Sequence, residues 1–469
     1  MTTKISKLEL SNSPREVLAR IRDRAGASLL ESASLMPGLS AWSYIACNPV
    51  FTLENRGAKT VLLENGEILE TWGNPFEALE NVFNRFKLEP QTRPDGMNFA
   101  GGWLGFLGYD LVRYLEDIQR KDFCRGDDKH HPSQDTQPDL RLHLMDFVLA
   151  FDHENQTWYS STTKLEGFKN REHVWTEILE LIQIETCSKT SFKTGELEAL
   201  TSPEKYLEDV ERCLEFIQAG DVFQVNLTHR LEAEFSGDPF ALYKALMLTN
   251  PAPFAAFLSG EDLAVVSASP ERFLKKTENM LEARPIKGTR ARGQTPEEDQ
   301  VQKRELEQSE KDRSENLMIV DLMRNDLGRV AKFGTVQVSD LFTLEPHGAV
   351  WQMVSTITAE LRPEFSSVDV LRATFPPGSM TGAPKVRAMQ IIQELEPVRR
   401  GVYSGMIGYF DLNGDFDLSV VIRSAVIANN RIQIQAGGAI VADSNPEAEL
   451  EETYAKTRAL RMVLEKGNS

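Results

Sequence analysis

Short strand-like runs that recur between a few long helical segments most constrain how this chain can fold. Five such runs lie in the second half of the chain, at 223–227, 263–268, 405–410, 419–428 and 431–436. Long helical patterns stand apart from them, at 297–326, 383–394 and 446–466. Strands in series with segregated long helices are typical of α+β folds. We therefore predict an α+β fold in which layered antiparallel β-sheets are flanked by helices.

The chain has 469 residues, which is enough for more than one domain. Its first part carries strand-like runs at 61–69 and 147–158 and a helical period at 172–184. A polar segment rich in Thr, Ser and Lys follows, which is typical of a linker. We predict an amino-terminal region at 1–184, a linker at 185–202 and a catalytic domain at 203–469.

Composition excludes several classes of protein. The formal net charge of −18 disfavours nucleic-acid binding, which demands a basic surface. The sequence has no apolar stretch long enough to span a membrane, and residues 1–10 lack the apolar core of a secretion signal. Four widely spaced cysteines (Cys47, Cys124, Cys187 and Cys213) indicate reduced thiols of a cytoplasmic protein. We expect any anion site to be built locally from arginine, lysine, backbone N–H groups or a metal ion.

Lys287 is the first candidate for chemistry, because it lies between an apolar residue, Ile286, and Gly288. Desolvation would lower the pKa of its ammonium group and free a nucleophilic amine. Gly288 would leave space beside that amine for a substrate. A structural lysine, or one whose head reaches the solvent, is the open alternative.

Two carboxylates fall on apolar helix faces. The segment 445–447 (NPE) is a helix start signal, and a helical period places Glu452 within a stripe of small apolar residues, with Lys456 at its margin. The residues of that stripe are Ala448, Ala455, Ala459, Met462 and Val463. Glu315 shares its face with Met318, Ile319 and Leu322 in the same way. Such carboxylates suit Mg²⁺, although a plain Glu452–Lys456 helix pair is the open alternative.

Three further features are candidates for the site: one for acid catalysis and two for binding an anionic substrate. Glu271 follows an apolar strand, where it could act as a general acid or pair with Arg272. The small-residue loop at 378–385 runs into a helix and offers N–H groups to an anion. Arg423 interrupts the run at 419–428, and it could hold a carboxylate or pair with a neighbouring acid.

Together these motifs resemble those of the chorismate-utilising enzymes, and most closely the large subunits of the aminodeoxychorismate synthases. The resemblance extends from Pro203 to Glu465 and is carried by the segments 220–226 (GDVFQVN), 269–273 (SPERF), 285–289 (PIKGT), 311–316 (KDRSEN), 321–326 (DLMRND), 378–385, 407–409 and 437–444. It is weaker in the first part, through 29–32 and 101–109.

The resemblance implies a reaction. Lys287 would add at C2 of chorismate while the C4 hydroxyl leaves, with Glu271 as the general acid that protonates the departing hydroxyl. Ammonia would then add at C4 and expel the lysine, giving 4-amino-4-deoxychorismate for 4-aminobenzoate and folate biosynthesis. A class I glutamine amidotransferase subunit would supply the ammonia.

The resemblance also implies the remaining site residues. Glu315 and Glu452 would hold Mg²⁺ against the substrate. The residues implied to bind chorismate are Gln224, Thr289, Thr381, Gly382, Tyr409, Arg423, Gly437, Gly438 and Lys456. A tryptophan pocket is implied at Ser32, Leu39, Ser40, Ala41, Trp42, Pro253, Phe254 and Ala255.

Four positions distinguish this chain within the family. Isochorismate and salicylate synthases carry a water-activating lysine at the position of Gln224, and anthranilate synthases typically carry alanine at the position of Lys287. Relatives often have histidine at the position of Gln352 and a third glycine at that of Ala439.

Two alternatives remain open: anthranilate synthase component I, which releases pyruvate, and a non-catalytic tryptophan-sensing subunit.

Overall fold

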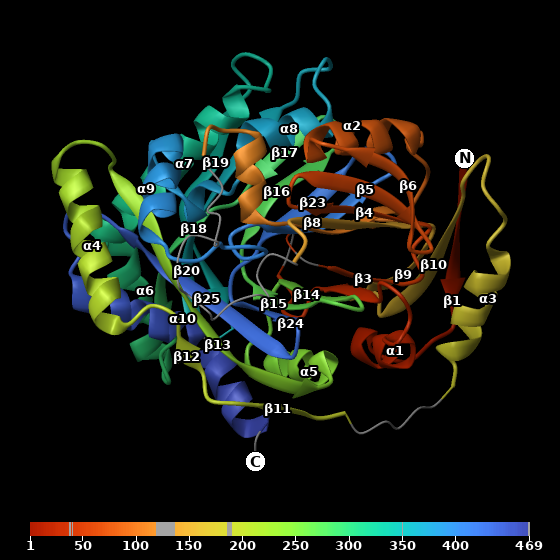
Figure 1. Cartoon of the computed structure of the whole chain (residues 1–469), viewed down its shortest axis with the longest axis horizontal. Helices are drawn as coiled ribbons and strands as arrows, with labels where there is room; N and C mark the ends of the chain where they lie inside the picture. The colour runs from red at the N-terminus through yellow and green to blue at the C-terminus, as the bar shows by residue number, and fades with distance from the viewer. Residues whose placement is uncertain (37–38, 40, 119–136, 185–189, 349, 468–469) are drawn as a thin grey trace.

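Two large antiparallel sheets form the middle of the molecule, and helices cover their outer faces (Figure 1). The fold is known from a computed structural model, which describes residues 1–36, 39, 41–118, 137–184, 190–348 and 350–467. The predicted α+β class with layered antiparallel sheets is therefore confirmed.

Among the described residues, the first sheet has 13 strands. In spatial order they are β1 (Thr2–Leu8), β10 (Thr157–Lys164), β9 (Phe147–Asp152), β3 (Trp42–Ala46), β2 (Ser28–Glu31), β14 (Phe254–Ser259), β15 (Ala264–Ser269), β24 (Ser424–Ala428), β25 (Arg431–Ile440), β13 (Gln224–Gly237) and β11 (Phe192–Thr194), with β12 (Glu198–Ala199) and β21 (Gly382–Ala383) also paired to β13.

In the part of the chain that the structure describes, the second sheet has 12 strands. Their order is β18 (Ile286–Ala291), β20 (Val350–Glu360), β17 (Met280–Ala283), β16 (Arg272–Thr277), β23 (Phe416–Val420), β22 (Met406–Asp411), β7 (Gly102–Leu107), β8 (Leu140–Met145), β4 (Phe51–Arg56), β5 (Lys59–Glu64) and β6 (Glu67–Trp72), with β19 (Gln337–His347) paired to β20.

The described helices lie outside the two sheets. They are α1 (Pro14–Ile21), α2 (Pro75–Arg85), α3 (Glu172–Leu181), α4 (Pro203–Gln218), α5 (Pro239–Thr249), α6 (Pro296–Gln308), α7 (Glu310–Gly328), α8 (Ser367–Thr374), α9 (Lys385–Leu395) and α10 (Pro446–Gly467), with short 3₁₀ turns at Tyr109–Tyr114 and Gly378–Met380. Within the described chain, no helix is both long and apolar enough to cross a membrane.

Layers of apolar side chains hold these parts together. Side chains from both sheets, such as Tyr44, Leu104, Val265 and Ile407, fill the space between them. Helices α2, α7 and α8 pack on the outer face of the second sheet, and α1, α3 and α5 on that of the first. Accordingly, α2 and α8 lie above the sheets in Figure 1, and α1 and α5 lie below them.

Both sheets cross the predicted boundary between the amino-terminal region and the catalytic domain. In the first sheet β2 pairs with β14, and in the second β7 pairs with β22. The predicted linker contributes β11 and β12 to the first sheet, whereas its residues 185–189 lie outside the described chain. The division at 185–202 stays a prediction about the sequence, since neither sheet is complete without strands from both sides of it.

Several elements begin where the sequence predicts. Ser202 caps α4 by accepting a hydrogen bond from the backbone N–H of Lys205 (3.2 Å), and Pro203 occupies the first turn. The Asn445 side chain accepts from the N–H of Ala448 (2.9 Å) at the start of α10. The start of α10 is thus the one read from the sequence, and α4 begins at the predicted start of the catalytic domain.

Other predicted elements are broken. The helix expected at 297–326 is two helices, because Ser309 leaves helical geometry (ψ 107°) and caps α7 instead. The strand-like runs at 61–69, 147–158 and 419–428 each form two strands. Each break contains a residue in the left-handed region: Asn65 (φ 51°), Gln156 (φ 49°) and Arg423 (φ 51°). For the last run the consequence is large, because β23 and β24 belong to different sheets.

Candidate active site

A β-bulge places Lys287 at the edge of the second sheet. In the pairing of β18 with β20, Ile286 lies opposite Val354 and Thr289 lies opposite Gln352, so β18 holds one extra residue. Gly288 takes a left-handed φ of 84° in this bulge. A Cβ on it would lie 2.9 Å from side-chain atoms of Leu306 and Asp312. The space beside Gly288 is therefore filled by α6 and α7, contrary to the expectation that it leaves room for a substrate.

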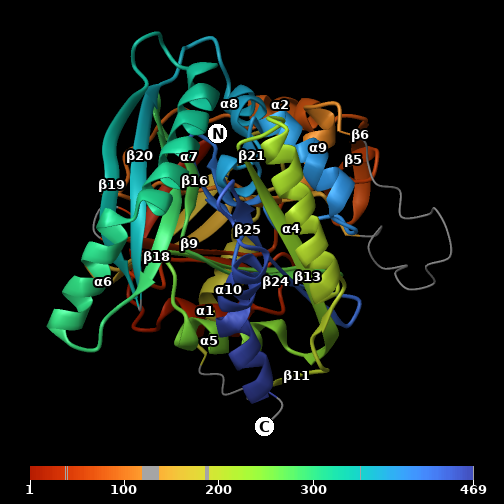
Figure 2. The same ribbon diagram turned by 90° about the vertical axis from the view of Figure 1, so that its left-hand side faces the viewer.

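Side chains from separate elements surround the Lys287 amine. Burial lowers the pKa of Lys287, and Lys456 lowers it further, against the opposing effects of Glu315, Glu271 and Glu452. These neighbours come from α10, α7 and the segment between β15 and β16. Figure 2 shows the side of the molecule on which α7 and α10 gather with β18 and β13. The predicted catalytic and metal-binding residues are thus brought together in space.

Glu271 is buried next to this amine, with 5% of its surface exposed. Burial raises its pKa to about 7, against the effects of the Ser379 hydroxyl, Lys287 and the backbone of Ile286. The alternative pairing with Arg272 does not form: Arg272 binds Asp417 and Glu282 instead. A carboxyl that holds its proton near neutrality beside a lysine suits a general acid.

The apolar stripe predicted on the last helix is buried only in part. The buried residues of α10 include Leu450, Thr453, Thr457, Leu460 and Val463, whereas Ala448, Ala455 and Met462 are exposed. Glu452 and Lys456 are close to half exposed and form an ion pair of 2.7 Å, the alternative left open by the sequence. Burial raises the pKa of Glu452, but the ion pair with Lys456 outweighs this effect and holds that pKa below its usual range.

Glu449, one turn before Glu452, is the buried carboxylate that the sequence analysis missed. Its side chain is 3% exposed and accepts a hydrogen bond of 2.6 Å from the Ser444 hydroxyl. The Lys311 ammonium lies between it and Glu315, 3.8 Å from one and 3.9 Å from the other. The acidic run at 449–452 was the signal in the sequence, but helical period pointed to Glu452, which is more exposed than Glu449.

The carboxylates of α7 and α10 face one another and suit a hard cation. Burial raises the pKa of Glu315 and of Glu449, and the nearby Glu452 raises both further. Repulsion of this kind is relieved by a divalent ion with oxygen ligands, and Mg²⁺ takes only one or two protein carboxylates. In the described chain, no three His, Cys, Asp or Glu side chains form a closed metal-binding group.

Unpaired amides line the start of β13. Gln224 is fully buried, and neither its Oε1 nor its Nε2 has a hydrogen-bond partner among the described residues. The same holds for the Nδ2 of Asn226, two residues along the same strand, and for the Oε1 of Gln352. Burying an amide without a partner is costly, so these groups are candidates to bind a polar ligand.

The loop at 378–385 joins β13 through backbone contacts. Thr381 is buried and accepts from the N–H of Asn226 (2.8 Å), and Gly382 pairs with Val225. Lys385, however, pairs with Asp326 and donates to the carbonyl groups of Thr374 and Pro376. This lysine therefore holds the loop in place, and the backbone of the loop is what remains for an anion.

The other predicted substrate residues lie on different elements. Arg423 lies between β23 and β24, where burial lowers its pKa and Glu271 opposes that shift. The Gly437 carbonyl accepts from Lys456 (2.8 Å), and a Cβ on Gly438 would lie 2.6 Å from Glu449. Thr289 is exposed beside the bulge.

Tyr409 is not brought to this group. It is buried between the sheets, where its ring stacks on Phe99 (4.7 Å between centroids) and meets Tyr44 edge-on (5.5 Å). Burial and the neighbouring Tyr44 raise its pKa well above the usual value. Tyr409 instead lines a separate pocket.

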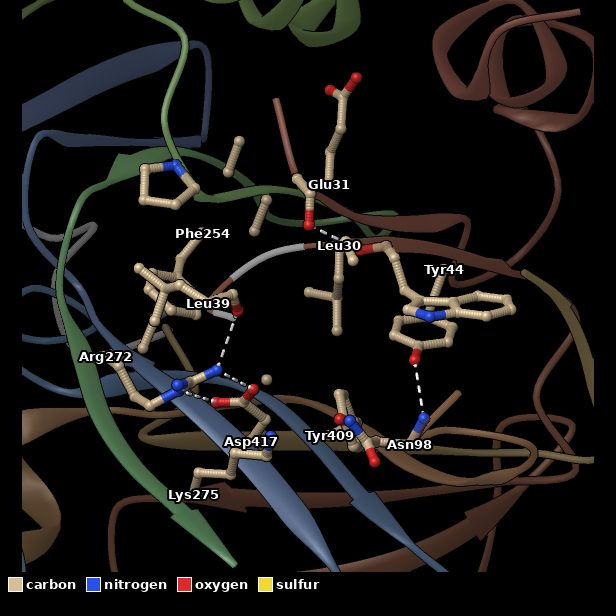
Figure 3. Close-up of a pocket in the computed structure, with 18 of the residues that line it drawn as sticks. Leu30, Glu31, Leu39, Tyr44, Asn98, Phe254, Arg272, Lys275, Tyr409 and Asp417 are labelled. Carbon is tan, nitrogen blue, oxygen red and sulfur yellow. Dashed lines mark hydrogen bonds and ion pairs between the residues drawn. The ribbon is translucent and has the colours of Figure 1, made fainter. Parts of the chain in front are cut away.

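That pocket is a cavity of about 240 Å³ between the sheets (Figure 3). The predicted tryptophan-site residues that line it are Ser32, Leu39, Ala41, Trp42, Pro253, Phe254 and Ala255. Ser40, the eighth, lies outside the described residues. Arg272 and Asp417 close one side of the pocket, and Tyr44 and Asn98 another.

Comparison with known proteins relates this site to one family. The family description "chorismate binding enzyme" matches residues 43–462. The chain is 40% identical over 451 residues to aminodeoxychorismate synthase component 1 of Escherichia coli, covering 96% of this chain and 95% of that one. It is 37% identical over 476 residues to anthranilate synthase component 1 of Acinetobacter calcoaceticus, covering 98% and 94%. The crystal structure of anthranilate synthase component I from Streptococcus pneumoniae superposes with a TM-score of 0.78 at 30% identity, covering 91% and 93%.

The raised pKa of Glu271 predicts a pH-dependent cost to stability. The unfolded chain releases this proton near pH 4.5 and the folded chain near pH 7, so the free energy of unfolding falls as pH rises between them. Glu271→Gln removes this loss. We expect the variant to gain up to about 3 kcal/mol over the native protein between pH 5 and pH 8 in urea unfolding. Glu261→Gln, at an exposed position, should show no such gain, and equal behaviour of the two variants would contradict the assignment.

Proposed function

Because the chain belongs to the family of chorismate binding enzymes, we propose that it is the large subunit of an aminodeoxychorismate synthase in the cytoplasm. It would aminate chorismate at C4 to give 4-amino-4-deoxychorismate. The observation that carries the proposal is the Lys287 amine, presented by a β-bulge beside the buried carboxyl of Glu271. The family resemblance associates lysine at this position with amination at C4 and alanine with anthranilate synthases.

The site geometry supports a covalent route. The neutral Lys287 amine attacks C2, and protonated Glu271 gives its proton to the departing C4 hydroxyl, which leaves as water. Ammonia then adds at C4, the bond between C2 and the lysine breaks, and the two ring double bonds that shifted when the hydroxyl left return to their places. Burial supports both roles, because it lowers the pKa of the lysine and raises that of the acid.

Binding of the substrate falls to the remaining groups. Arg423 has no carboxylate within ion-pair distance among the described residues, and it lies near Glu271. Gln224 offers an unpaired amide at the start of β13, where the family resemblance implies that ammonia and not water is the nucleophile. We further propose that a class I glutamine amidotransferase subunit supplies this ammonia.

We propose that Mg²⁺ is held by Glu315 and Glu452, with Glu449 beside them. When bound, Mg²⁺ would neutralise a substrate carboxylate that these acidic side chains would otherwise repel. The Lys311 ammonium group lies between Glu315 and Glu449 and offsets part of their negative charge.

The product of the reaction tests the main proposal. The purified chain is incubated with chorismate, Mg²⁺ and ammonium at mildly alkaline pH, and the products are identified by mass spectrometry. We expect a product that keeps the enolpyruvyl group and carries an amine in place of the hydroxyl. Anthranilate with pyruvate would identify anthranilate synthase component I instead. In Lys287→Ala, a covalent adduct seen by intact mass in the native protein should be absent.

Calorimetric titration with MgCl₂ tests the metal site without relying on turnover. Glu315→Gln and Glu452→Gln should each weaken Mg²⁺ binding by about 10- to 100-fold, because they remove charge where the cation lies. Glu451→Gln is the matched control, since Glu451 lies on the same helix but is exposed. Unchanged affinity in both site variants would exclude this position for the ion.

We propose that the pocket of Figure 3 binds tryptophan. An aromatic wall of Trp42, Tyr44 and Phe254 would contact an indole ring, and Glu31 and Asp417 lie nearby for the ammonium group. Denaturing the purified protein should release tryptophan close to one molecule per chain, measured by mass spectrometry. Phe254→Ala should reduce the release, whereas Phe333→Ala, at a fully exposed position, should not. Trace amounts from the native protein would rule out a resident tryptophan.

A further inference from the structure

Arg272 follows the proposed general acid in the chain but serves a different part of the molecule. Glu271 turns toward Lys287, whereas Arg272 lies in the wall of the pocket in Figure 3. Its side chain is 2% exposed. Neither the proposed chemistry nor the proposed tryptophan site uses its guanidinium, so its burial needs another explanation.

The guanidinium of Arg272 is bound on every side. Its Nε and Nη2 donate to the two carboxylate oxygens of Asp417 at 2.9 and 2.8 Å, and Nη1 donates to Glu282 at 2.7 Å. Nη2 also donates to the Leu39 carbonyl at 3.1 Å, and the group lies 5.2 Å from the centre of the Phe254 ring. A bidentate arginine–carboxylate pair fixes direction as well as distance.

This fork joins the first residue of β16 to β23 at a place where the ladder is irregular. Arg272 pairs with Ser419 and Leu274 with Leu418, so one extra residue of β16 bulges between them. Next to the Arg272–Ser419 pair, the Val420 N–H donates to the Glu271 carbonyl (3.0 Å). Bulges redirect the side chains next to them, and here the clamp to Asp417 is a side-chain contact made from the first residue of the bulge.

We propose that Arg272 is a positioning residue for Glu271: its fork onto Asp417 fixes the start of β16 so that the Glu271 carboxyl faces Lys287. The proposal rests on the acid role assigned to Glu271.

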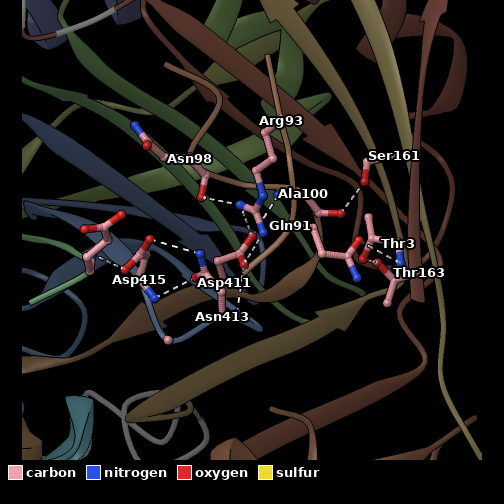
Figure 4. Close-up of polar contacts among 12 residues, drawn as sticks. Thr3, Gln91, Arg93, Asn98, Ala100, Ser161, Thr163, Asp411, Asn413 and Asp415 are labelled. Carbon is pink, nitrogen blue, oxygen red and sulfur yellow. Dashed lines mark hydrogen bonds and ion pairs between the residues drawn. The ribbon is translucent and has the colours of Figure 1, made fainter. Parts of the chain in front are cut away.

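A second buried pair supplies a matched control. Arg93 donates to both oxygens of Asp411 at 3.0 and 2.7 Å and to the Asn98 carbonyl at 3.2 Å (Figure 4). Asp411 ends β22 and Asp417 lies in β23, so both pairs brace the same hairpin. The two pairs have similar stabilising roles, but only Arg272 adjoins Glu271.

The experiment compares Arg272→Gln, Arg272→Lys and Asp417→Asn with Arg93→Gln. Chorismate consumption is measured with Mg²⁺ and ammonium at constant free ammonia, together with urea unfolding of each variant. We expect Arg272→Gln and Asp417→Asn to lower kcat by about 10- to 100-fold, because a displaced acid transfers its proton poorly. KM for chorismate should stay within about twofold, since Arg272 does not touch the substrate. Arg272→Lys should recover part of kcat, and Arg93→Gln should lose stability while keeping kcat.

The pH profile separates positioning from a general loss of stability. The charged groups facing Glu271 are Lys287 from β18, Lys456 from α10 and Arg423 from the segment between β23 and β24. They are unchanged in all four variants. A loosened β16 admits water to Glu271 and removes part of the burial that raises its pKa, so the fall in kcat on the alkaline side should move to lower pH. Arg93→Gln should leave this limb in place.

Equal kcat loss in Arg272→Gln and Arg93→Gln, or a change confined to KM, would overturn the proposal. If Arg272→Gln does not fold, Asp417→Asn carries the same test, because it breaks the fork from the partly exposed side. The identity of the product reports on the proposed function separately. Anthranilate as the product would refute the amination at C4, while the kcat and pH comparison would still decide the role of Arg272.

Discussion

Backbone hydrogen bonding between strands far apart in the sequence is the constraint on which the rest of this structure depends. β2 pairs with β14 in one sheet, and β7 pairs with β22 in the other. The pocket between the sheets lies between these two ladders, since its walls include residues of β2, β14 and β22. The candidate active site lies farther along the same sheets, where β18, α7 and α10 meet.

The fold class and several helix starts could be predicted from the sequence, because they depend on local signals. Apolar period, capping residues and proline at the first turn act within a few residues. The breaks could not be predicted in the same way. Arg423 adopts a left-handed conformation that arginine seldom takes, and the pairing of β23 and β24 with different sheets imposes it. The sheet to which a strand belongs depends on partner strands far away in the sequence, and the spacing of apolar residues within the strand does not reveal those partners.

The site shows the same division. Lys287 and Glu271 were proposed from the residues next to them in the chain, and those residues also lie next to them in the structure. Tyr409 was assigned to the substrate from the family resemblance alone, but strand geometry turns it to the pocket between the sheets. Glu449 was missed because the buried face of α10 contains threonine and glutamate, so an apolar stripe was the wrong guide. Burial of polar helix residues is decided by what packs against them.

The strand order also has a consequence for how the chain is made. Leu107 pairs with Met406, so the second sheet cannot close until the ribosome has synthesised nearly the whole chain. Until then the strands of the first part present unpaired edges and an uncovered apolar face. Such late, non-local closure slows folding and exposes the nascent chain to aggregation. We expect the newly made protein to depend on chaperones more strongly than a two-domain protein of equal length whose domains fold one after the other.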